Sequence, residues 1–163
     1  MEFTTSNLTL FVTTLLVGLT AGLCFTWGNA VTPGIGQLDD LGYLQAFQKM
    51  NRSIENPLFF AVFFGSFLVG LVTLYTNRAV SPEHFRLLLI AMGFYTVGVL
   101  LVTVIGNVPL NQILDKTDLA TGSVEELRAL RQRFEIPWNR FHLIRIIAAM
   151  ISFALLVIAA IHK

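Results

Sequence analysis

The chain has 163 residues, of which 55% are hydrophobic and only 13% are charged, and its formal net charge is +1. Soluble domains average about 25% charged residues, so this composition predicts a membrane protein of one domain, residues 1–163. A net charge of +1 does not suggest a nucleic-acid footprint, and no nucleic-acid partner is expected.

Four charge-poor, apolar runs, in chain order 8–31, 57–77, 86–106 and 138–161, predict four membrane-spanning helices. A spanning helix needs roughly 20 mostly apolar residues. These runs are too long and too uniformly apolar for the strands of a membrane barrel. The expected fold is therefore all-α, an antiparallel four-helix bundle in the lipid bilayer with both chain ends on one side.

Two connections lie at the opposite end of the bundle, here called side B. In the 32–56 connection, apolar residues at helical spacing alternate with charged ones, which predicts a short amphipathic helix. In the 107–137 connection, Ser123 and Glu126 have the spacing of a capping box. A second amphipathic helix is expected to start there and end near Phe134. Both helices are expected at the membrane interface.

The distribution of cations predicts the orientation in an inner or plasma membrane. Side B carries eight of the eleven Lys and Arg residues, and the other side carries three. The positive-inside rule then places side B in the cytoplasm and both termini on the extracytoplasmic side. Pro137 fits the first turn of the fourth span, where a missing N–H costs nothing.

Polar and aromatic side chains from all four spans gather at side B. They are Trp27, Asn29, Asn51, Arg52, Asn56, Asn107, Asn111, Trp138, Arg140, His142 and Arg145. Trp138, His142 and Arg145 have i, i+4, i+7 spacing and form one stripe of the fourth helix. Asn107 and Asn111 share a face if the third helix continues through Pro109. We expect this face to meet the stripe.

Several of these residues also have ordinary structural interpretations. The tryptophans fit an interfacial belt, Asn29 and Asn107 can cap helix ends, and Arg140 can reach the lipid headgroups. Arg145 is harder to explain in this way, because a cation two turns inside a span is costly unless it faces a partner or a wet cavity.

Metal and ion-pathway functions are not expected. Of the three histidines, only His142 lies on side B, which argues against a multi-histidine metal site. No acidic residue lies in the middle of a span, which argues against a proton or ion pathway through the bundle.

Four segments, GLTAGLCFTWGNAVTPGIGQL, AFQKMNRSIENP, GNVPLNQIL and WNRFHLIRIIAAM, resemble in this order the anthrone oxygenase-like family of small four-helix membrane proteins. The resemblance covers nearly the whole chain. It implies oxidation of an anthrone, or a similar polycyclic phenolic compound, to a quinone with O₂ and without metal, flavin or other cofactor. The motif residues that it carries over are Asn51, Arg52, Asn56, Asn107, Pro109, Asn111, Trp138, His142 and Arg145.

The residues are compatible with such a cofactor-free monooxygenase. Loss of a proton from the acidic CH₂ of an anthrone gives an electron-rich anion that can pass an electron to O₂. His142 would be the base, because imidazole titrates near neutral pH. Arg145, with Arg140, would stabilise the oxyanion. The substrate ring and its oxygens would be held by Phe25, Trp27, Trp138, Asn107 and Asn111.

Two other functions fit the same residues. In a non-enzymatic membrane protein, the polar layer would lock the helices together by interhelical hydrogen bonds, each worth about 0.6 kcal/mol. In a binder of a lipid, quinone or other small hydrophobic molecule, or in an accessory subunit, the layer would hold a ligand without chemistry. A closed polar core favours the first, and a pocket of about 300 Å³ or more favours a ligand. The oligomeric state stays open.

Overall fold

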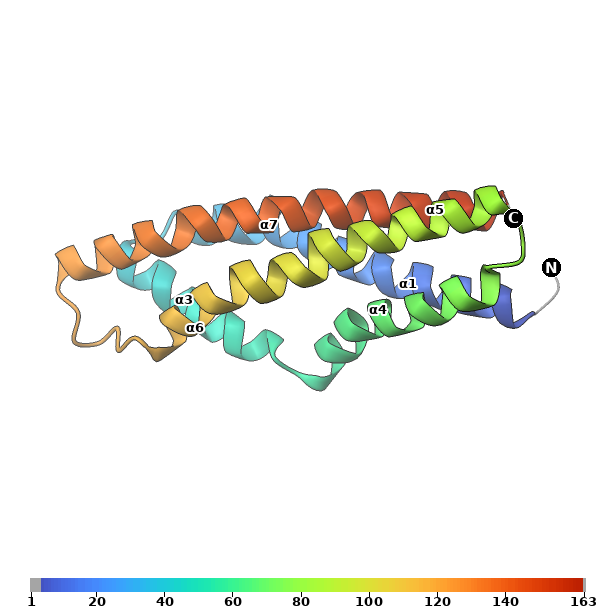
Figure 1. Ribbon diagram of the computed structural model, residues 1–163. Helices are drawn as coiled ribbons and strands as arrows, with labels where there is room; N and C mark the ends of the chain where they lie inside the picture. Colours follow the sequence, from blue (N-terminus) through green and yellow to red (C-terminus); the bar gives the residue numbers. More distant parts are fainter. Residues whose placement is uncertain (1–3, 163) are drawn as a thin grey trace.

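The computed structural model describes residues 4–162, and the regular secondary structure of this part of the chain is helical, without strands (Figure 1). In the element names, η marks a π-helical segment. The elements are α1 (Thr5–Thr26), η1 (Trp27–Val31), α2 (Thr32–Ile35), α3 (Asp40–Ile54), α4 (Pro57–Asn77), α5 (Pro82–Gly93), η2 (Phe94–Leu101), η3 (Thr103–Asn107), α6 (Val108–Lys116) and α7 (Val124–Ile161).

Four helical runs are long and apolar enough to cross a membrane: Thr5–Ile35, Pro57–Asn77, Pro82–Lys116 and Val124–Ile161. They lie side by side in an antiparallel bundle with both termini at one end (Figure 1). The prediction of a four-helix integral membrane protein is confirmed. Three runs extend beyond their predicted ends, because the helix continues past the apolar stretch into side B. Which side of the membrane carries the termini stays a prediction.

The predicted amphipathic helix of the first connection is confirmed as α3, but the second one is not a separate element. The capping box is present, since Ser123 Oγ accepts from Glu126 N at 3.3 Å and the Glu126 carboxylate accepts from Ser123 N at 2.8 Å. The helix that it opens does not end near Phe134 but continues as α7 to Ile161. Only residues 117–123 of the 107–137 connection are non-helical.

Pro137 consequently lies inside α7 and not in its first turn, which corrects the prediction. A proline inside a helix removes one backbone hydrogen bond. The helix continues because Phe134 and Trp138 on both sides of the proline are buried, with ring centroids 4.7 and 4.8 Å from that of Phe47. The third run continues through Pro109, which falls in the first turn of α6 directly after η3.

Two apolar clusters hold the bundle together. One lies between the spanning helices and includes the fully buried Val17, Leu88, Tyr95, Val99 and Leu156. The other lies at side B, under α3, and includes Tyr43, Leu44, Phe47, Leu114 and Trp138. The polar layer predicted at side B lies where these two clusters meet.

Hydrogen bonds fix α3 against α6. The Gln48 side-chain amide donates to the backbone oxygens of Leu114 and Thr117 at 2.7 and 3.0 Å. At the surface, Arg52 Nε donates to the Asp115 carboxylate at 2.6 Å. The α3 helix is therefore a fixed cover over the side-B end of the bundle.

Arg131 of α7 fixes the segment that leads into α3. Its guanidinium donates to the backbone oxygens of Gly36 and Leu38 at 2.8 and 2.9 Å. It also donates to the carboxylates of Asp40 and Glu135 at 3.2 and 2.7 Å. This arginine is mostly buried, with two carboxylate partners and two carbonyl partners, and it holds α2, α3 and α7 together.

Small residues set the distance between η2 and α7. A Cβ placed on Gly98 would collide with the Cβ of Ala148. Gly93, earlier in the same helical run, has no neighbouring atom within 4 Å of such a Cβ. The two glycines therefore provide a matched test of this contact.

Gly98→Ala is expected to lower the free energy of unfolding by about 1–3 kcal/mol, because η2 and α7 must move apart. Gly93→Ala is expected to leave it unchanged or raise it by up to about 1 kcal/mol through helix propensity. The measurement is the unfolding of both variants in detergent. Equal losses in both variants would contradict the close contact between Gly98 and Ala148.

Candidate functional site

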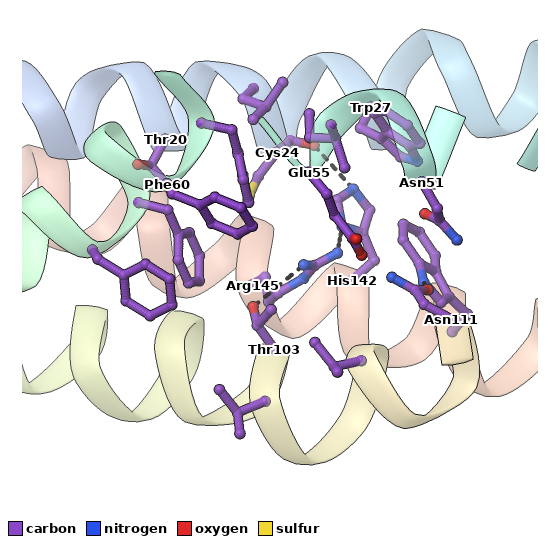
Figure 2. A pocket seen from close by; sticks show the side chains of 18 residues that line it. Thr20, Cys24, Trp27, Asn51, Glu55, Phe60, Thr103, Asn111, His142 and Arg145 are labelled. Atoms are coloured by element: carbon purple, nitrogen blue, oxygen red, sulfur yellow. Dashed lines mark hydrogen bonds between the residues drawn. The ribbon is translucent and has the colours of Figure 1, made fainter. Parts of the chain in front are cut away.

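A cavity of about 160 Å³ lies in the side-B half of the bundle, between α1, the end of α3, the start of α4, η3 and α7 (Figure 2). This is less than the roughly 300 Å³ at which pockets for drug-sized ligands begin. An apolar cavity of about 150 Å³ is nevertheless large enough for benzene. The polar layer therefore contains a cavity, and the volume of this cavity suits one aromatic ring.

The walls of the cavity combine charged, amide and aromatic side chains. Figure 2 shows Thr20 and Phe60 at one end, Trp27, Asn51 and Asn111 at the other, and Cys24, Glu55, His142 and Arg145 between them. Charged groups thus lie at the centre of the cavity, with an aromatic side chain towards each end.

The hydrogen bonds of His142 define one tautomer. Its Nε2 lies 3.1 Å from the backbone oxygen of Cys24, and its Nδ1 lies 2.7 Å from Arg145 Nη2. A carbonyl oxygen only accepts and a guanidinium only donates. Nε2 therefore carries the hydrogen and Nδ1 accepts from Arg145. Neither ring nitrogen has a free lone pair for another group in this arrangement.

Arg145 is a partly buried cation without an anionic partner in the described chain. Its Nη1 donates to Thr103 Oγ1 at 3.3 Å and its Nη2 donates to His142. No carboxylate of residues 4–162 lies within 4 Å of it, and its buried Nε has no acceptor. Burial of an unpaired charge is costly, so the site has the charge for an anionic or strongly polarised ligand.

The predicted stripe of α7 is present as a stack. The rings of Trp138 and His142 lie 4.8 Å apart at 28°, and the Arg145 guanidinium lies 5.3 Å from the Trp138 ring. The two amides of the third run face this stripe, as expected. Asn111 Oδ1 accepts from Trp138 Nε1 at 2.7 Å, and Asn107 Nδ2 donates to the Trp138 backbone oxygen at 3.2 Å.

Two further donors at the cavity lack an acceptor. The indole N–H of Trp27 and the Nδ2 of Asn51 are buried and have no hydrogen-bond partner within the described residues. Together with Arg145, three residues that carry a buried, unpaired donor therefore belong to the wall of the same cavity. Buried donors without partners are rare in proteins, and these three suit a ligand with acceptor oxygens.

Two of the predicted site residues have structural partners at the edge of the site. Arg52 is exposed and pairs with Asp115. Asn56 accepts from the backbone N–H of Phe59 at 3.0 Å and caps the start of α4. Neither residue is a wall of the cavity.

Asn29, Arg140 and Phe25 are exposed and do not line the cavity. Asn29 and Arg140 each lie two positions after a cavity residue, Trp27 and Trp138, and a helix turns through roughly 200° over two residues. They therefore point away from the site. The expected ring contact of Phe25 and the expected oxyanion contact of Arg140 are not supported.

The backbone is unusual beside the cavity. The π-helical η1 begins at Trp27, and the π-helical η3 runs from Thr103 to Asn107. Such segments occur frequently at functional sites. Gly28 of η1 lies against α7, where a Cβ would meet the end of the Ile146 side chain and would be in ordinary contact with the His142 ring at 3.5 Å.

A model of the anthrone oxygenase family matches residues 58–155, more than half of the chain. The chain belongs to the anthrone oxygenase family. The match includes Thr103, Asn107, Asn111 and the α7 stripe, while Trp27, Asn51 and Glu55 lie before it. No curated protein matches the chain, and no solved structure matches it.

In this member of the anthrone oxygenase family, the cavity wall also contains residues that the sequence analysis does not single out. They are Glu55, Thr103 and the α4 residues Phe59, Phe60, Phe63 and Phe64. A signal existed in Glu55-Asn56-Pro57, which combines an acid with a helix start at the level of the predicted polar layer.

Two arginines of α7 allow a test of whether the layer is a site or a structural lock. Arg145→Met is expected to change the free energy of unfolding by no more than about 1 kcal/mol, because an unpaired buried charge is removed. Arg131→Met is expected to lower it by about 3 kcal/mol, because two carboxylates and two carbonyls lose their donor. The measurement is denaturant unfolding in detergent. A large loss for Arg145→Met would favour the structural lock.

Proposed function

We propose that this protein binds a flat aromatic compound bearing oxygen in its side-B cavity and oxidises it with O₂ to a quinone. The substrate class is an anthrone or a similar polycyclic phenolic compound. The observation that carries the proposal is Arg145, a partly buried cation without a carboxylate partner in the described chain, in a cavity wall that also contains Trp27 and Asn51 with their unpaired donors.

Arg145 is proposed to bind the substrate oxygen that becomes negative. When an anthrone loses a proton from its CH₂ group, the charge moves to the oxygen across the ring. A guanidinium in an apolar, water-poor cavity stabilises such an oxyanion more strongly than it would in water. The anion is then the electron donor to O₂, and the family resemblance implies that no cofactor takes part.

His142 is proposed to position Arg145. The sequence suggests His142 as the base, but its Nδ1 accepts from Arg145 and its Nε2 donates to Cys24. The Trp138 ring stacks on it from one side. These contacts support a neutral imidazole that holds the guanidinium in place.

The substrate is proposed to enter from the membrane. Several side chains in the wall are partly exposed on the lipid-facing surface, among them Phe60 and Phe64 at 43% each and Val104 at 49%. The enclosed volume suits one ring, so the outer rings of a polycyclic substrate would extend into this opening. A flat apolar substrate concentrates in the bilayer and reaches the opening without crossing water.

The purified protein in detergent or nanodiscs is expected to consume O₂ with an anthrone and form the anthraquinone. Arg145→Ala and His142→Ala are each expected to lower the rate at least about 100-fold, the typical effect of losing an oxyanion donor. Arg133→Ala, an exposed arginine of the same helix, is the control and is expected to keep the rate. The assignment fails if both variants fold and turn over as the wild type does.

A non-enzymatic quinone or small-molecule binder is the second candidate, because three unpaired donors around a small cavity also suit quinone oxygens. The chain has two tryptophans, and both line the cavity. Their fluorescence therefore reports directly on binding.

Anthraquinone is expected to quench the tryptophan emission saturably. Anthracene, which has the same shape without oxygens, is expected to bind at least about tenfold more weakly through loss of one or more hydrogen bonds. Saturable quenching without O₂ uptake on any anthrone would establish a binder. Equal affinities for the two compounds would contradict a role for the polar donors.

A further inference from the structure

We infer that Glu55 accepts the proton that the substrate loses in the side-B cavity. The inference rests on the proposed function and adds a residue that lies outside the family match. It starts from the charges of the cavity wall, which has two basic side chains, His142 and Arg145, both on α7. Glu55 carries the one carboxylate among the described residues that line the cavity.

The Glu55 carboxylate is free to act. It has no hydrogen bond and no ion pair within residues 4–162, although its neighbours Arg52 and Asn56 are both engaged. Glu55 lies just after the last residue of α3, where the backbone leaves the helical conformation with φ −75° and ψ 66°. Glu55 is a wall residue of the cavity, and Figure 2 shows its side chain in the same part of the cavity as His142 and Arg145.

The other groups of the cavity do not offer a base. The lone pair of His142 Nδ1 accepts from Arg145. Arg145 itself only donates, and the amides of Asn51 and Asn111 are not basic. Cys24 is a buried thiol that would first have to lose its own proton.

The substrate requires the base and the cation to lie apart. In an anthrone, the acidic carbon and the carbonyl oxygen are on opposite sides of the central ring. Glu55 and Arg145 come from different helices and face the same cavity without forming an ion pair. A ring placed between them would present its CH₂ to the carboxylate and its oxygen to the guanidinium.

The step balances in atoms and charge. The substrate C–H bond breaks, an O–H bond forms on the Glu55 carboxyl, and the electron pair moves through the ring to the oxygen beside Arg145. The Glu55 carboxylate becomes a neutral carboxylic acid, and the substrate takes over the negative charge as an anion. O₂ is the oxidant of the later steps, in which CH₂ becomes C=O and one water is released. Because Glu55 is exposed, its proton can reach water at side B without crossing the bundle.

The test separates proton removal from oxidation. Under anaerobic conditions in D₂O, the wild-type protein is expected to accelerate deuterium exchange at the CH₂ of an anthrone above the protein-free rate. Glu55→Gln is expected to lose at least about 100-fold of this acceleration. Its affinity for anthraquinone, measured by tryptophan quenching, is expected to stay within about threefold. Glu55→Asp, which keeps a carboxylate, is expected to restore part of the exchange.

Glu125→Gln, an exposed glutamate in the first turn of α7, is the matched control and is expected to exchange as the wild type does. Exchange retained in Glu55→Gln would overturn the assignment of Glu55 and leave the proposed function intact. Equal losses of affinity and exchange in that variant would make Glu55 a binding residue and overturn its role as the base. No acceleration by the wild type, together with no O₂ uptake, would overturn both proposals.

Discussion

The arrangement of the candidate site depends above all on accommodating the charge of Arg145 inside an apolar bundle. Within the described chain, no carboxylate neutralises it, and its neighbours are a hydroxyl, an imidazole and the face of an indole. His142 can contact Arg145 only if its other nitrogen donates to the Cys24 carbonyl. Thr103 of η3 is the other hydrogen-bond partner of Arg145. A single cation thus links α1, η3 and α7 around one cavity.

Arg131 and Arg145 of α7 show how an arginine that stabilises the fold differs from an arginine of the candidate site. Arg131 has carboxylate and carbonyl partners that satisfy its guanidinium, and it joins α3 to the bundle. Arg145 keeps one donor unpaired at the edge of a cavity. Both lie on one helix, yet the first stabilises the fold and the second leaves charge available to a ligand. Ionisable residues inside membrane-spanning segments are costly, and such a residue is the first candidate for a functional site.

The α3 helix lies over the side-B end of the bundle and also positions residues of the candidate site. It is anchored to α6 by Gln48 and to α7 through Arg131, so the residues at its end have a defined position. Asn51 and Glu55 line the cavity from the end of α3, whereas His142 and Arg145 line it from the spanning helix α7. A ligand between them would meet water-exposed groups on one wall and lipid-exposed phenylalanines on another, which suits an apolar substrate that must exchange a proton with water.

Local periodicity was enough to predict the four spans, the polar layer and the Trp138–His142–Arg145 stripe, because helical spacing alone decides which residues share a face. The tertiary structure decided the rest. It made α7 continuous through Pro137, because the packing of Phe134 and Trp138 outweighs the lost hydrogen bond. It turned Asn29 and Arg140 outward and brought Glu55 inward. Which side chains line a cavity depends on how helices distant in sequence approach one another, and no single helix carries that information.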